Sequence, residues 1–232
     1  MRRGGQDQAN GTPAKRSPRL PKEVQDALSP AVERAWRRIV PHLPAQVYLG
    51  GGTAVAIYLH HRVSRDLDFF YHDDSLDLGA LERELKSIGA VVTLRAPGTL
   101  RVQIGEAKVE FLHADEKAPQ HQIEKPKEVG GVPLASLRDI MAMKLKVLAE
   151  RGELRDYYDV MQIDERGGVS VEDGIALFLE RYGLDSASEP LHHLIRSLGY
   201  LDDCEDDEAV PMSKHDLAAW WRKRQAEVIR NL

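Results

Sequence analysis

The sequence contains a single cysteine, Cys204, which limits the chemistry available to the chain. One cysteine cannot form an intramolecular disulfide or a cysteine-based zinc site, and so low a count is typical of a reducing compartment. The chain also lacks any run of about 18 apolar residues, so we expect no membrane-spanning helix. The N-terminal stretch MRRGGQDQAN has no apolar core and predicts no secretory signal. These absences together predict a cytoplasmic protein.

A positive net charge is also missing, because the formal net charge is −5. Proteins that bind long nucleic acids through a broad surface are usually basic, so any nucleic-acid contact here must be local, brief or directed by a site. Residues 1–20 have few apolar side chains and several basic ones, and we expect them to form a disordered basic tail. The chain as a whole is 42% hydrophobic over 232 residues, which is enough for a sizeable core.

The hydrophobic pattern separates a mixed segment from an all-helical one. Between residues 21 and 132 we expect helices at 21 or 29 to 40, 53–61 and 75–88, strands at 46–49, 65–71, 90–95, 99–104 and 107–112, and a loop over 114–131. From residue 133 only helices are expected, beginning with one that starts at Ser136 in a weak capping box with Asp139. We therefore predict an α+β fold, with a mixed-sheet core over 21–132 and a helical C-terminal domain over 133–232.

A glycine turn joins the expected strand 46–49 to the helix that follows it. Gly51 and Gly52 remove Cβ atoms where another group must approach the backbone. The start of the helix offers unpaired N–H groups and a positive dipole end to an anion, and Thr53 adds a hydroxyl. This turn predicts a phosphate site only together with other features, since glycine-rich turns between strands and helices are common.

Two aspartates follow on the expected strand 65–71. Asp66 and Asp68 are two residues apart, so they point to the same face, about 7 Å apart along the strand. Two carboxylates on one face can hold divalent cations, and hard oxygen ligands favour Mg²⁺ or Mn²⁺. Glu110, on the expected strand 107–112, completes a carboxylate triad if the two strands are neighbours. Taken alone, the D-x-D pair and Glu110 are each better explained by a solvent-exposed strand face.

Together the glycine turn, the helix and the D-x-D strand resemble the DNA polymerase β-type nucleotidyltransferase superfamily. More closely, the stretch GGTAVAIYLHHRVSRDLDFF is similar to the AbiEii/AbiGii toxin family of nucleotidyltransferases. That family typically has GGTAL and then R-x-S-x-D-hydrophobic-D-hydrophobic. The matching residues are Gly51, Gly52, Thr53, Ala54, Arg62, Ser64, Asp66 and Asp68.

A second stretch, KLKVLAERGELRDYYDV at 144–160, resembles the helix pair of the same family. The family pattern is K-L-x-A-L-x-x-R-x-x-x-R-D-x-Y-D, and Val147 stands where it usually has alanine. The matching residues are Lys144, Arg151, Arg155, Asp156, Tyr158 and Asp159. An amphipathic helix with a charged face explains any one of these charges, but not the two stretches together. The resemblance covers about residues 46–165, and the C-terminal third shows no family motif.

The resemblance implies a nucleotidyltransferase-like core and a Mg²⁺- or Mn²⁺-dependent enzyme that transfers NMP from an NTP to an acceptor. The metal ligands that it implies are Asp66, Asp68 and Glu110. The nucleotide-binding residues that it implies are Gly51, Gly52, Thr53, Arg62, Ser64, Lys144, Arg151 and Arg155. The catalytic set that it implies is Asp66, Asp68, Glu110, Lys144 and Asp156, where Asp156 or Asp159 orients a basic side chain or the acceptor.

The resemblance further implies an RNA acceptor such as a tRNA 3′ end, in the toxin of a type IV-like toxin–antitoxin or abortive-infection system with a cognate antitoxin. Three alternatives stay open. The acceptor is a small molecule, as for antibiotic-modifying relatives; or the fold is catalytically silent and serves binding or regulation; or the chain is an interaction protein that uses Trp220 and Trp221. The sequence leaves open the nucleobase, the acceptor and the oligomeric state.

Overall fold

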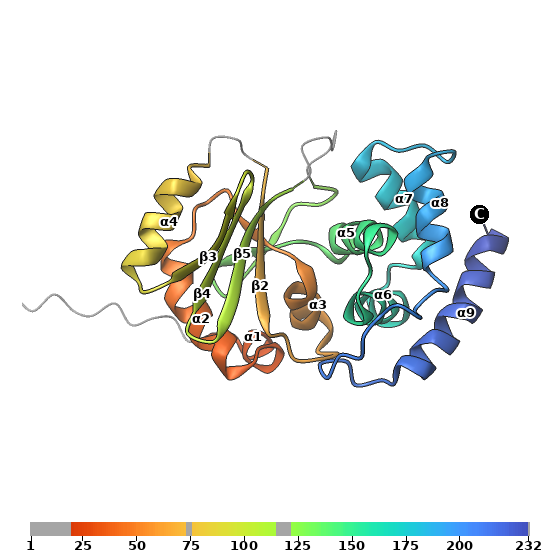
Figure 1. The fold of residues 1–232 in the computed structure, drawn as a ribbon, viewed down its shortest axis with the longest axis horizontal. Helices are drawn as coiled ribbons and strands as arrows, with labels where there is room; N and C mark the ends of the chain where they lie inside the picture. The colour runs from red at the N-terminus through yellow and green to blue at the C-terminus, as the bar shows by residue number, and fades with distance from the viewer. Residues whose placement is uncertain (1–19, 73–75, 115–121, 232) are drawn as a thin grey trace, which may run out of the picture.

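The computed structural model describes residues 20–72, 76–114 and 122–231. In Figure 1 a twisted sheet and its helices lie at the N-terminal end of the molecule, and a group of helices lies at the C-terminal end. The expected basic tail over 1–20 lies, apart from Leu20, outside the described residues. None of the helices of the described part is long and apolar enough to cross a bilayer.

Helices and strands are mixed along the described chain up to β7, and only helices follow. The helices are α1 (Lys22–Ala27), α2 (Pro30–Ile39), η1 (Val40–His42), α3 (Gly51–Leu59), α4 (Leu78–Ser87), α5 (Leu137–Glu150), α6 (Leu154–Arg166), α7 (Val171–Tyr182), α8 (Glu189–Ser197) and α9 (Lys214–Asn231). The strands are β1 (Tyr48–Leu49), β2 (Asp66–Tyr71), β3 (Val91–Ala96), β4 (Thr99–Ile104), β5 (Ala107–His113), β6 (Lys127–Val129) and β7 (Val132–Leu134). The predicted order of a mixed segment followed by helices is confirmed.

The strands form one mixed sheet in the order β3-β4-β5-β2-β1-β7-β6. Strand β2 pairs in parallel with β5 and antiparallel with β1, so it lies at the centre of the sheet. In Figure 1 α2 and α4 lie against the β3–β5 part of the sheet, and α3 lies beside β2, between the sheet and helices α5 and α6. The α+β fold class is therefore confirmed, with β2 facing the helical part.

Alternation along β2 decides which residues enter the core. Leu67, Phe69 and Tyr71 are buried, whereas the residues between them are half-buried on the opposite face. The ring of Phe69 stacks on that of Phe111 in β5, with centroids 5.3 Å apart. Burying each such aromatic side chain contributes roughly 1.5–3 kcal/mol, which sets the register of β2 against β5. That register in turn orients Asp66 and Asp68 away from the core.

Several expected boundaries differ from the structure. The helix expected at 53–61 begins at Gly51, so both glycines belong to α3. Of the two starts expected for the first helix, the one at 29 is confirmed, because Ser29 caps α2. The residues before it form a separate helix, α1, because the chain is extended at Leu28 and Ser29. The expected loop 114–131 contains β6, which pairs with β7 around the turn at Gly130 and Gly131. The sheet thus continues to Leu134, just beyond the boundary expected at residue 132.

The caps and core of the C-terminal helices agree with the sequence pattern. The Ser136 hydroxyl accepts a hydrogen bond from the Asp139 N–H at 3.0 Å, so the expected start of α5 is confirmed. Trp221 is fully buried and donates its indole N–H to the Tyr157 carbonyl at 3.2 Å. Trp220 is half-buried and donates to Glu165 at 2.7 Å. Both tryptophans therefore pack within the chain, which removes the observation behind the interaction-protein alternative.

Candidate active site

One face of the central strands carries charged side chains in two rows. Opposite residues in neighbouring strands share a face, so the pairing of Asp66 with Lys108 makes one row. The pairing of Asp68 with Glu110, and of Glu110 with Arg101 in β4, makes the next row. The expectation that Glu110 lies beside the D-x-D strand is confirmed.

Glu110 is held by two cations, which the sequence interpretation did not include. Arg101 Nε donates to Glu110 Oε1 at 2.7 Å, and Lys108 Nζ lies 2.6 Å from Oε2. Burial by itself raises the pKa of Glu110, but these two hydrogen bonds bring it below its usual value. Among the residues that the structure describes, no three acidic, histidine or cysteine side chains are grouped to hold a metal ion. The expected triad is therefore not preassembled, because Lys108 and Arg101 share the face of Glu110.

Asp68 lies in a strongly negative environment. Burial, with Asp66 and Glu110 nearby, raises the pKa of the Asp68 carboxyl to about 6. Both effects disfavour its ionised form, and a cation between Asp66 and Asp68 would relieve them. Carboxylate oxygens are hard ligands, so this pair fits a divalent cation such as Mg²⁺ or Mn²⁺.

The glycine turn allows two site residues to approach the backbone. Gly51 has φ +60°, and a Cβ on it would lie 2.5 Å from Asp68 Oδ2. A Cβ on Gly52 would overlap the guanidinium of Arg62. The Gly50 N–H also donates to the Asp68 carbonyl at 2.9 Å, which joins the turn to β2. The glycines therefore place the N-terminus of α3 directly beside the second acid of the D-x-D motif.

The sequence interpretation expected the Thr53 hydroxyl to contact an anion. In the structure the hydroxyls of Thr53 and Ser64 form hydrogen bonds within the protein instead. Both residues are buried, and their oxygens lie 2.5 Å apart. Thr53 donates its proton to the Asp66 carbonyl, so Ser64 must donate to Thr53. This is a correction for Thr53, whose hydroxyl joins α3 to the start of β2, because tertiary packing encloses it.

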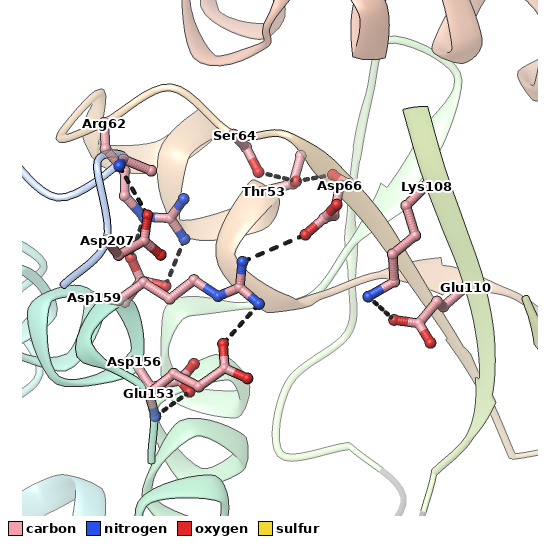
Figure 2. A network of polar contacts seen from close by, with 12 residues as sticks. Thr53, Arg62, Ser64, Asp66, Lys108, Glu110, Glu153, Asp156, Asp159 and Asp207 are labelled. Carbon is pink, nitrogen blue, oxygen red and sulfur yellow. Dashed lines mark hydrogen bonds and ion pairs between the residues drawn. The ribbon is translucent and has the colours of Figure 1, made fainter. Parts of the chain in front are cut away.

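The two family-like stretches meet in a buried cluster around Asp159 (Figure 2). Asp159 accepts from Arg62 Nε and Nη2 at 2.7 and 2.9 Å, and its Oδ1 lies 2.7 Å from His61 Nε2. Lys144 Nζ lies 2.8 Å from Asp159 and 2.6 Å from Asp156. Sequence reasoning gave His61 no role, because the order of residues alone does not show that it faces Asp159.

The charges of this cluster compensate one another. Burial by itself would raise the pKa of Asp159, but Lys144, Arg62 and the His61 hydrogen bond bring it far below its usual range. Burial would likewise lower the pKa of Lys144, but Asp156 and Asp159 raise it above its usual value. Both groups are therefore fully charged at neutral pH. In this structure Lys144 and Asp159 bind each other, and Asp156 helps to position the lysine.

Arg155 and Arg151 lie at the open side of this cluster. Arg155 Nη1 lies 3.5 Å from Asp66 Oδ2, and its Nη2 lies 2.7 Å from Glu153. These two contacts place the guanidinium between Asp66 and Glu153. The Arg151 side chain is 69% exposed and pairs with Glu153 at 2.9 Å. Arg155 is therefore the closer of the two to the carboxylate pair.

A cavity of about 770 Å³ lies between the sheet and the helical part. Its size falls within the range of small-molecule sites. Apart from the buried Thr53 and Asp159, every candidate site residue lines it: Gly51, Gly52, Arg62, Ser64, Asp66, Asp68, Glu110, Lys144, Arg151, Arg155 and Asp156. The structure also brings Asp207 to this cavity from the loop before α9, a loop to which the sequence interpretation gave no role.

The comparison with protein families and known sequences gives two matches. The family described as "Nucleotidyl transferase AbiEii toxin, Type IV TA system" matches residues 34–227, which extends beyond the two recognised stretches into α9. The uncharacterized protein aq_aa25 of Aquifex aeolicus (strain VF5) is 24% identical over 218 residues, which cover 92% of this chain and 99% of that protein.

The chain is also similar to solved structures. The crystal structure of a putative nucleotidyltransferase from H. pylori has a TM-score of 0.55 and 19% identity, with 92% of this chain and 97% of that chain covered. The crystal structure of JHP933 from Helicobacter pylori has a TM-score of 0.47 and 16% identity, with 92% and 96% covered. The first of these two likenesses shows a shared fold.

Proposed function

Because the chain belongs to the family of AbiEii nucleotidyl transferase toxins, we propose that it transfers NMP from an NTP to the 3′ end of an RNA such as tRNA. One observation carries the proposal: the carboxylates of Asp66 and Asp68 face the same cavity as the glycine turn that begins α3. A carboxylate pair beside a helix N-terminus offers sites for a divalent cation and for phosphate.

The phosphates of the NTP lie along the charged rows of the sheet in this proposal. Asp66 and Asp68 hold Mg²⁺ or Mn²⁺, and the N–H groups at Gly51 and Gly52 bind phosphate oxygens. When bound, the divalent cation neutralises charge on the triphosphate as it develops. The acceptor hydroxyl oxygen forms a bond to the α-phosphorus, the bond from that phosphorus to the bridging oxygen breaks, pyrophosphate leaves and the hydroxyl proton passes to solvent.

The remaining candidate residues act around this centre. Arg155 is the cation nearest to Asp66, so we assign it to the phosphates, with Arg151 farther out at the entrance. Arg62 and Lys144 are tied to Asp159, so they position the wall of the cavity and supply positive charge from behind it. Glu110, bound by Lys108 and Arg101, becomes a metal ligand only if one of these cations moves to the phosphates.

The charge of the cavity does not by itself select the acceptor. Of the described residues that line it, nine are Lys or Arg and seven are Asp or Glu. Three of these cations, Arg62, Lys144 and Arg181, are paired with the buried Asp159 and Asp139 behind the wall. The RNA acceptor therefore rests on the family, and the assay below separates it from the antibiotic-type alternative.

A labelled-transfer assay tests the proposal. The purified protein is incubated with Mg²⁺ and each α-labelled NTP in turn, with either total tRNA or an aminoglycoside as acceptor. The matched variants are Asp66→Asn/Asp68→Asn, which removes the carboxylate pair, and Asp206→Asn, an exposed acid outside the cavity. Label should enter tRNA with the wild type and with Asp206→Asn only. Transfer to the aminoglycoside alone, or transfer by the double variant, would contradict the proposal.

The toxin role has its own test. Induced expression of the wild type in bacterial cells should stop growth, and the Asp66→Asn/Asp68→Asn variant should not. Co-expression of a neighbouring gene that encodes the antitoxin should restore growth. Arrest by the double variant would show that growth inhibition does not depend on nucleotidyl transfer.

A further inference from the structure

A third row of side chains follows the two charged rows on the same face of the sheet. Phe70 is paired with Tyr48 in β1 and with Leu112 in β5, and Leu112 is paired with Thr99 in β4. Phe70 lies two residues beyond Asp68, about 7 Å along the strand. Phe70 and Leu112 line the cavity, so its floor changes from charged to apolar within one row.

The opposite wall of the cavity is apolar at the same place. Met143 and Val147 are four residues apart on one face of α5, and Tyr182 ends α7; all three line the cavity. A Cβ on Gly50 would lie 2.8 Å from the Phe70 ring and 3.6 Å from the Met143 methyl group. Phe70 and Met143 therefore both lie against the turn between β1 and α3. The apolar part of the cavity is thus a slot between the sheet and α5.

A buried polar network fixes the aromatic side of this slot. Arg181 is 2% exposed and donates from Nη1 to Asp139 at 2.5 Å and from Nη2 to the Tyr48 hydroxyl at 3.3 Å. The Tyr48 oxygen lies 3.0 Å from His72 Nε2. Burial raises the pKa of Tyr48 to about 12, so the phenol keeps its proton at neutral pH. The Tyr48 ring stacks on Phe70, with centroids 5.9 Å apart.

This network has no part in the phosphate and metal chemistry proposed above. Tyr48, Asp139 and Arg181 are almost completely buried, and burying such groups is costly unless they are held in one geometry. What they hold is the orientation of Phe70, the first side chain beyond the acids. A rigid aromatic surface next to a phosphate site is the arrangement that accepts a planar base by stacking.

We propose that Phe70, Leu112, Met143, Val147 and Tyr182 form the seat of the nucleobase of the incoming NTP, and that Tyr48 and Arg181 position Phe70 within it. The proposal rests on the proposed function, since it takes the phosphates to bind at the charged rows. With the phosphates there, the ribose spans the distance of one row, and the base reaches the apolar slot. Stacking and apolar contact then supply affinity for the nucleoside part of the substrate.

Equilibrium binding with two ligands tests the seat. The wild type, Phe70→Leu, Tyr182→Leu and the control Val91→Ala are titrated, with Mg²⁺, with each NTP and with inorganic tripolyphosphate. Val91 is 64% exposed and outside the cavity, so its variant removes apolar surface elsewhere. Phe70→Leu and Tyr182→Leu should weaken NTP binding about tenfold, while tripolyphosphate binding stays unchanged. Thermal unfolding of each variant checks that the fold is kept.

Each other result has a distinct meaning. Unchanged NTP binding by both leucine variants, with a wild type that binds NTP, would overturn the base seat and leave the proposed function intact. An equal loss of NTP and tripolyphosphate binding would also overturn the seat, because the residues would then act on the phosphates. A wild type that binds neither ligand would overturn the proposed function, and the seat with it.

The positioning role of Tyr48 needs a readout that a purely structural role would not move. Tyr48→Phe keeps the ring and removes the hydroxyl that Arg181 holds. It should raise KM for the NTP several-fold, with kcat and the inhibition constant of tripolyphosphate unchanged. A general loss of folded protein would lower kcat instead. An unchanged KM, or a fall in kcat alone, would exclude Tyr48 as a positioning residue.

Discussion

Arg155 Nη1 lies 3.5 Å from Asp66 Oδ2, so a cation of α6 stands next to the first acid of the D-x-D strand. These two residues belong to the two separate family-like stretches of the sequence. Their ion pair spans the cavity between the sheet and the helical part. The Arg155 guanidinium also pairs with Glu153, so two carboxylates fix its position at the cavity.

Replacing Arg155 should therefore affect the nucleotide more than the fold. Arg155→Gln removes a cation from the place where the triphosphate is proposed to lie, and charge-assisted contacts with phosphate are among the stronger hydrogen bonds. We expect KM for the NTP to rise about ten- to a hundredfold, as for the loss of one such contact of about 1.5–3 kcal/mol. Steady-state kinetics checks this, with the exposed Arg83→Gln as control. Equal KM values in the two variants would remove Arg155 from the nucleotide site.

Removing the charge of Asp159 should destabilise the protein strongly. Asp159→Asn leaves Arg62 and Lys144 buried without their shared carboxylate, and breaking a buried pair in this way costs about 3–5 kcal/mol. Denaturant unfolding at neutral pH measures the loss, and the exposed Asp202→Asn serves as control. A loss below about 1 kcal/mol would mean that the cluster is less dependent on this carboxylate than its contacts indicate.

Gly51 and Gly105 allow the cost of a positive φ to be distinguished from the cost of a steric clash, because their φ angles are nearly equal. Gly51 and Gly105 have φ of +60° and +62°, but a Cβ on Gly105 meets nothing within 4 Å. Gly105→Ala should cost about 1–2 kcal/mol for its left-handed conformation alone. Gly51→Ala adds a collision with Asp68, so it should destabilise the protein further and abolish nucleotidyl transfer. Equal stability and equal activity of the two variants would show that Asp68 moves aside freely.

The contribution of the ion pair between α7 and α9 to the free energy of unfolding should depend on pH. Arg224 Nη1 donates to Glu172 at 2.9 Å, and hydrogen bonding from Arg224 lowers the pKa of Glu172 from 4.5 to about 2. A carboxyl with a lowered pKa stabilises the fold above pH 4.5, and this contribution is lost as the pH falls towards 2. Glu172→Gln should lower the free energy of unfolding by about 1 kcal/mol at pH 7, since partial exposure screens the pair.

Urea unfolding between pH 7 and pH 3 measures this difference for Glu172→Gln and for Glu180→Gln, an exposed acid on the same helix. The deficit of Glu172→Gln should shrink as the pH falls, whereas that of Glu180→Gln should stay small throughout. A deficit that does not change with pH would show that Glu172 contributes through packing rather than through its charge.

Local patterns predicted much of the fold because they depend on near neighbours. Ser136 and Asp139 placed the start of α5, and the alternation over β2 placed Asp66 and Asp68 on one face. The short β6–β7 hairpin was missed, since strands of three residues carry too little periodic signal. The separate helix α1 before Ser29 was also missed, because an extended residue between two apolar stretches leaves no pattern of its own.

The candidate residues were predicted from the sequence, but the contacts that they make in the fold were not. Thr53 looked like a ligand for an anion and is instead buried against Ser64 and the Asp66 carbonyl. Glu110 lies beside Asp68 as expected, but its two cations come from the pairing of β4 with β5 and from Lys108. The sequence around a carboxylate does not show which charged side chains will surround it in the fold.

The sequence by itself determined the order of helices and strands, the shared face of the two aspartates and the glycine turn before α3, because these follow from spacing over a few residues. Only the tertiary structure decided that Asp159 joins His61 and Arg62, about a hundred positions away, and that Phe70 lies against Tyr48 beside a buried Arg181. Burial and partners are properties of the packed chain, since they depend on which distant elements the core brings together.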